Sequence, residues 1–153
     1  MVAAFQSGDL FNPANFALWL FPHRMNLSRL LLLNGIATLA AGIVLFVAPG
    51  WIPSTVGIHL DRSANLLGYL LGSSEIAVAA LCLFARSLDD APALRAVVLT
   101  LITFHAASAM AEAYAFSEGV SAVIWINVAV RAVMIALLWK YRPRKPGTGR
   151  RPQ

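Results

Sequence analysis

His105, Ser108 and Glu112 are the residues whose types and spacing first point to chemistry. They lie within an apolar run of about 25 residues, from 92 to 116, and about 20 such residues suffice to cross a bilayer. Offsets of three and seven positions place all three side chains on one face of a helix. A charged side chain at the centre of a bilayer costs about 3 kcal/mol on insertion scales. We therefore expect this face to be turned toward a protein interior or a water-filled cavity.

Further polar residues interrupt the other apolar segments at matching depths. Measured from the outer end of each predicted helix at about 1.5 Å per residue, Glu75 and His105 both lie about 16 Å deep. Arg131 and Asn34 lie about 18 Å and 21 Å deep on the same scale. All four depths fall near the middle of a hydrocarbon core about 30 Å thick. The sequence thus predicts one intramembrane polar cluster, whose members are Asn34, Glu75, His105, Ser108, Glu112, Asn127 and Arg131.

The charges of this cluster predict an ion pair and an acid–base site. Arg131 cannot lose its proton, so it needs a carboxylate partner. Glu75 matches Arg131 in depth, whereas Glu112 lies about 12 Å higher on the same scale, so we expect a pair between Arg131 and Glu75. His105 would supply a second positive charge when protonated, or hold a neutral carboxyl group by a hydrogen bond. Glu75, His105 and Glu112 are therefore the candidate catalytic residues, with acid–base roles.

Other chemistries fit the same residues less well. Polar side chains in membrane bundles often only hold helices together, so a purely structural cluster is an alternative. Haem ligated by two histidines is not expected, because His105 is the one histidine in a predicted span. One histidine and two glutamates lack the Glu-x-x-His spacing of helical metal sites, so no metal is predicted. Ser108 is three residues from His105 but has no recognisable nucleophile motif. The cofactor, if there is one, is not identified.

Composition indicates an integral membrane protein. The chain is 59% hydrophobic and only 12% charged, whereas soluble domains have about 25% charged residues. The predicted fold is an all-α, integral membrane four-helix bundle over residues 27–141. Its predicted spans are residues 27–48, 64–84, 92–116 and 120–140.

Two flanking segments complete the predicted organisation. Residues 1–26 form the predicted N-terminal segment, which is rich in aromatic residues between about 10 and 21. A short amphipathic helix that begins at Asn12-Pro13 is predicted to lie in the membrane interface; the alternative is a lid that folds under the bundle. Residues 142–153 form a basic tail rich in Pro and Gly, which is predicted to be disordered.

Small residues predict where the second helix packs. Gly68 and Gly72 form a GxxxG pattern, and Glu75 falls on the same helical face. Because small residues let helices approach closely in lipid, this face should contact another helix. Cys82 is the one cysteine of the chain, which excludes an intrachain disulfide, and it is predicted to be a small core residue.

The basic residues predict the orientation in the membrane. One side carries Arg24, Arg29, Arg86, Arg95, Lys140, Arg142, Arg144, Lys145, Arg150 and Arg151. The other side carries Arg62 alone. This imbalance predicts that both termini face the cytoplasm. The basic tail follows a hydrophobic segment, so its expected partner is the lipid bilayer and not a nucleic acid.

The first two helices carry short motifs similar to those of a known group. These are Asn34-Gly35-Ile36-Ala37 through Val47-Ala48-Pro49, and Leu67-Gly68 through Gly72. Over about residues 27–140 the layout resembles small bacterial inner-membrane proteins of the DoxX-like grouping. The resemblance implies a four-helix fold and a location in the cell inner membrane. Relatives linked to thiol or quinone chemistry also imply redox partners. It transfers no catalytic residue, and the lone Cys82 does not fit thiol chemistry. The combination of Glu and His in a small bundle also looks like sterol-isomerase-type membrane proteins.

These observations favour a small membrane protein with a polar intramembrane pocket formed by Glu75, His105 and Arg131. The pocket would bind a small or lipophilic molecule, or relay protons, and the chain would act alone, as a homo-oligomer or as an accessory subunit of a membrane complex. The alternatives are a membrane-embedded enzyme of isomerase or redox type that uses a Glu/His acid–base pair, and a purely structural bundle.

Overall fold

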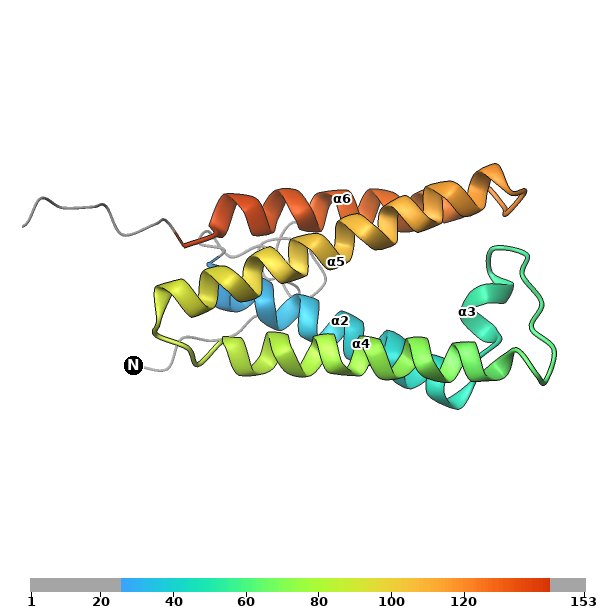
Figure 1. The fold of residues 1–153 in the computed structure, drawn as a ribbon, viewed down its shortest axis with the longest axis horizontal. Coiled ribbons are helices and arrows are strands. Elements are labelled where there is room, and N and C mark those ends of the chain that lie inside the picture. Colours follow the sequence, from blue (N-terminus) through green and yellow to red (C-terminus); the bar gives the residue numbers. More distant parts are fainter. Residues whose placement is uncertain (1–25, 144–153) are drawn as a thin grey trace, which may run out of the picture.

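The computed structural model describes residues 26–143, and all regular structure within them is helical (Figure 1). The helices are α2 (Leu27–Val47), α3 (Trp51–Ser54), α4 (Asn65–Ala85), α5 (Ala91–Ser117) and α6 (Ile124–Tyr141). Four of them, α2, α4, α5 and α6, are long and apolar enough to cross a membrane. The predicted all-α fold with four spanning helices is thus confirmed. The predicted interfacial helix lies outside the described residues, as does the predicted tail apart from Arg142 and Pro143.

Polar side chains set two of the helix starts. The side chain of Asn26 accepts a hydrogen bond from the backbone N–H of Arg29 at 2.9 Å and so caps α2. Asp90 caps α5 in the same way through the N–H of Ala93, also at 2.9 Å. Both side chains replace a partner that the first turn of a helix lacks. Among the described residues no side chain caps α6, which begins at Ile124 and not at residue 120, after a turn over residues 122–123.

Glycines bring α2 and α4 into close contact. A Cβ atom added to Gly72 would lie 2.9 Å from the backbone oxygen of Gly42 on α2. One added to Gly68 would lie 2.5 Å from Cβ of Pro49, just beyond the end of α2. The predicted helix contact at Gly68 and Gly72 is therefore confirmed, because no larger residue fits this seam without a shift of the backbone.

The bundle consists of two helix pairs, α2 with α4 and α5 with α6 (Figure 1). The pairs meet at the end where α2 begins and α6 finishes, here called the core end. Buried residues from all four helices form the core there: Leu30, Leu31, Cys82, Ala85, Val98, Leu101 and Leu138. Toward the opposite end, here called the open end, the two pairs diverge, and α3 lies beside the gap (Figure 1).

The segment between α2 and α4 lies outside the predicted spans and contains the short helix α3. At the open end, a backbone hydrogen bond joins the segment after α3 to the segment before α6. The backbone N–H of Ser121 donates to the carbonyl oxygen of Val56 at 3.2 Å. Because the helix pairs diverge, a space remains in the middle of the bundle, and the α3 segment covers part of it.

Candidate functional site

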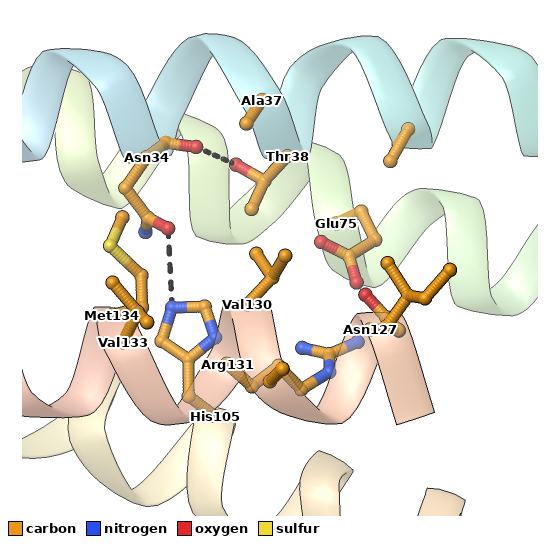
Figure 2. Close-up of a pocket in the computed structure, with 13 residues that line it drawn as sticks. Asn34, Ala37, Thr38, Glu75, His105, Asn127, Val130, Arg131, Val133 and Met134 are labelled. Carbon is orange, nitrogen blue, oxygen red and sulfur yellow. Dashed lines mark hydrogen bonds between the residues drawn. The ribbon is translucent and has the colours of Figure 1, made fainter. Parts of the chain in front are cut away.

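A partly open cavity of about 610 Å³ occupies the space between the two helix pairs (Figure 2). Residues of α2 and α6 line its two sides, and α4 and α5 contribute Glu75 and His105. Most of the lining is apolar. The lining residues are Asn34, Ala37, Thr38, Ala41, Glu75, His105, Ile126, Asn127, Ala129, Val130, Arg131, Val133 and Met134.

A second hollow of about 500 Å³ lies toward the open end. The α3 segment contributes Ile52, Pro53, Thr55, Val56 and Ile58 to its wall. Glu75, Asn127 and Arg131 line both spaces, so these polar side chains stand at their junction.

A chain of buried polar side chains joins three helices beside the cavity. Asn34 on α2 donates a hydrogen bond from Nδ2 to Sγ of Cys82 on α4 at 3.1 Å. The Asn34 Oδ1 atom lies 3.2 Å from Nε2 of His105 on α5 (Figure 2). The three residues are 2%, 0% and 5% exposed, respectively. Cys82 is a buried core residue as predicted, and it also accepts this hydrogen bond, which the sequence did not indicate.

The same chain assigns the tautomer of His105. Because the Asn34 amide nitrogen is used toward Cys82, its oxygen must accept, and Nε2 of His105 must carry the proton. In the neutral ring the Nδ1 atom of His105 is then an acceptor, and it is buried without a hydrogen-bond partner among the described residues. His105 thus retains one unused lone pair within the site.

The predicted ion pair between Arg131 and Glu75 is wrong. Arg131 Nε lies 2.9 Å from Oε1 of Glu112 instead, and each side chain is 16% exposed. Asn127 donates to the same carboxylate oxygen at 2.5 Å. The Arg131 guanidinium also lies 5.8 Å from the ring centroid of Phe104, a cation–π distance. Glu112 is therefore the ion-pair partner of Arg131.

The error comes from where the helices begin and end. Since α6 starts at Ile124 and α5 continues to Ser117, Arg131 and Glu112 lie about 10.5 Å and 7.5 Å from their outer helix ends. Their difference in depth is thus about 3 Å and not 12 Å. α5 and α6 are also direct neighbours, whereas α4 lies across the cavity.

The Glu75 carboxylate has neither a hydrogen bond nor an ion pair to any residue that the structure describes. The side chain projects from α4 into the cavity, toward the side of Asn127 and Arg131 (Figure 2). The residue is only 7% exposed. A carboxylate enclosed in a largely apolar space without a partner is costly unless it is protonated or meets a cation.

The structure places the remaining predicted residues unequally. Ser108 is half-buried on α5, lines neither space and has no side-chain hydrogen bond among the described residues, so the site does not include it. Thr38 lines the cavity, is 8% exposed and donates from Oγ1 to the carbonyl of Asn34 at 2.9 Å. Thr38 lies four residues after Asn34 on the same helical face, and this spacing is the feature of the sequence that indicates that Thr38 belongs to the site.

The site thus offers three groups to a bound molecule: the Glu75 carboxylate, the Nδ1 lone pair of His105, and the N–H groups of Arg131 other than Nε. Among residues 26–143, no group of three or more His, Cys, Asp or Glu side chains is arranged to hold a metal ion. Comparisons with protein-family models, with curated proteins and with solved structures give no match to this chain.

Proposed function

We propose that this chain is a small multi-pass membrane protein that binds a lipophilic molecule between its two helix pairs. The observation that carries this proposal is the cavity of about 610 Å³, with apolar walls and a few polar groups that converge in it. Ligand sites in proteins have about 300–1,000 Å³ and the same combination of apolar lining and sparse polar groups. A bundle held together only by packing has no need of such a space.

The side of the cavity between α2 and α6 supports access from the bilayer. Small residues line it, namely Ala37 and Ala41 on α2 and Ala129 on α6. Val130 and Val133 line the cavity from α6 and are 58% and 60% exposed. In a membrane such exposed apolar side chains face lipid tails, so a lipophilic molecule would reach the cavity without crossing water.

A membrane enzyme is the second candidate, and one observation favours it. Among the described residues, Nδ1 of His105 has no hydrogen-bond partner, and the Glu75 carboxylate in the same cavity has neither a hydrogen bond nor an ion pair. Such a pair is able to move a proton on a bound molecule, in an isomerisation for example. Chemical turnover of a bound molecule that stops in both His105→Phe and Glu75→Gln would favour this candidate.

Filling the cavity tests the binding proposal. Ala129→Trp places a large side chain in the cavity, whereas Ala132→Trp changes another exposed alanine of α6 that lines neither space. The purified protein in lipid nanodiscs is titrated with neutral N-phenyl-1-naphthylamine and with cationic tetraphenylphosphonium. We expect saturable binding of at least one probe by the wild-type protein and by Ala132→Trp, and its loss in Ala129→Trp. If neither probe binds saturably, or if Ala129→Trp binds as the wild type does, the cavity is not a ligand site.

A further inference from the structure

We propose that the molecule bound in this cavity is a lipophilic cation, and that Glu75 is its counter-ion and exchanges it for a proton. The inference rests on the proposed function, because it names the charge of the ligand for the same site. It starts from the buried carboxylate of Glu75, which lines the cavity without a hydrogen bond or ion pair among the described residues.

The charges around Glu75 leave one negative charge uncompensated. Arg131 on α6 is paired with Glu112 on α5 at 2.9 Å, and Asn127 donates to the same oxygen. Among the described residues, the other titratable side chain that lines this cavity is His105 on α5, whose Nε2 atom lies 3.2 Å from Oδ1 of Asn34. The α2 residues that line the cavity are all uncharged. With both glutamates ionised, the site therefore holds two negative charges and one positive charge.

This balance disfavours an anionic ligand and favours a cationic one. A second carboxylate or a phosphate would have to compete with Glu112 for Arg131, and would lie beside Glu75, a like charge. A neutral molecule would leave a proton as the one species that neutralises Glu75, and would gain nothing from its negative charge. A cation with apolar substituents meets the Glu75 carboxylate and the apolar walls at once.

A proton is the other species that neutralises Glu75, so the proton and the cation compete for the same carboxylate. When the cation binds, the O–H bond of Glu75 breaks, the proton leaves to solvent, and the carboxylate stays as the counter-ion. Glu75 lines both the cavity beside α2 and α6 and the second hollow at the open end. The cation is thus expected to arrive through the first space and the proton to leave through the second.

Calorimetric titration of the purified protein with tetraphenylphosphonium, and with neutral triphenylphosphine oxide of similar shape, tests this inference. The variants are Glu75→Gln, Glu75→Asp and, as a carboxylate outside both spaces, Glu118→Gln. We expect Glu75→Gln to weaken the binding of the cation by at least about tenfold and that of the neutral compound by less than about twofold. Glu75→Asp should retain most of the affinity for the cation, and Glu118→Gln should retain all of it.

The pH dependence is the second readout. Below the titration of Glu75, the affinity for tetraphenylphosphonium should rise by up to about tenfold for each pH unit, because about one proton is released for each cation bound. Titrations in two buffers with different heats of ionisation measure this proton directly. In Glu75→Gln the affinity should not change with pH, and no proton should be released.

The outcomes separate this inference from the proposed function. If the neutral compound binds and Ala129→Trp abolishes its binding, but the cation does not bind or is insensitive to Glu75→Gln, the cavity is a ligand site and the cation assignment is wrong. If neither compound binds and N-phenyl-1-naphthylamine does not bind either, the proposed function itself fails, whereas binding of the naphthylamine alone overturns the cation assignment. Binding of the neutral compound by Glu75→Gln also shows that this variant retains a folded cavity.

Discussion

The ion pair between Arg131 and Glu112 makes the sharpest prediction about how the bundle is held together. Both side chains are 16% exposed, so each charge is largely removed from solvent. Glu112→Gln removes the negative charge but retains an oxygen that accepts from Asn127. It leaves Arg131, which cannot lose its proton, without a counter-ion. Breaking a buried pair in this way costs about 3–5 kcal/mol, so the folding equilibrium constant should fall by a factor of at least about 100.

Arg131→Met should cost less, because the Glu112 carboxyl left behind is able to take up a proton. The double variant Glu112→Gln with Arg131→Met should recover much of the loss, with a coupling of about 2–3 kcal/mol, because both charges disappear together. Unfolding in mixed micelles by titration with dodecyl sulfate, followed through the fluorescence of Trp125 and Trp139 on α6, measures these free energies.

The matched control is Glu75→Gln with Arg131→Met. The structure gives Glu75 no contact with Arg131 within ion-pair distance, so this second double variant should show no comparable recovery. If it recovers more stability than the pair with Glu112 does, Arg131 is held across the cavity by α4. The arrangement of the helix pairs described above would then be refuted.

Three further predictions concern the seam, the topology and the loop at the open end. Gly72→Ala should lower the free energy of unfolding by about 1–3 kcal/mol, because its Cβ atom would lie 2.9 Å from a backbone oxygen of α2, whereas Gly50→Ala meets nothing within 4 Å and should have little effect. Reporter fusions after residue 88 and at the C-terminus should read cytoplasmic and one within residues 51–62 external, since the basic residues concentrate on one side; a periplasmic C-terminus would contradict this. In the loop before α4, hydrogen bonds from the Ser63 hydroxyl and the Ala64 N–H lower the pKa of Asp61 below its ordinary value. The contribution of these hydrogen bonds to the stability of the fold is thus complete above the pKa that Asp61 has in the unfolded chain. It is lost as the pH falls through the lower pKa of the folded state. Ser63→Ala should move the pKa of Asp61 back toward 3.8, which the carboxyl ¹³C chemical shift measures.

The sequence alone determined the architecture because the bilayer imposes simple rules on it. A spanning helix needs about 20 apolar residues, and these runs stand out at the positions where α2, α4, α5 and α6 occur. The close contact at Gly68 and Gly72 was also predictable, since small residues on one face of a membrane helix have few other purposes. Asn34, Glu75 and His105 were identified because polar residues inside such runs are costly and therefore few.

The partners of the polar residues were decided by tertiary structure. The sequence predicts the depth of a residue along its helix only to within a few residues. The predicted start of α6 was about one turn too early, and for this reason Arg131 was predicted to pair with Glu75, whereas the structure pairs it with Glu112. The sequence does not specify which helices are neighbours around a bundle, so it did not reveal that α4 lies across a cavity from α6. The role of Cys82 as the acceptor for Asn34 depends on the same information.

The helix faces, lengths and glycine seam of this chain are local properties, fixed by periodicity and by the cost of polar groups in lipid. The cavity and the isolated carboxylate of Glu75 are not local. They arise because the two helix pairs meet at the core end and diverge toward α3, which leaves Glu75 facing a space while Arg131 is satisfied by its own neighbour α5. Only the packing of the pairs against each other decides which buried charge is matched and which is left free.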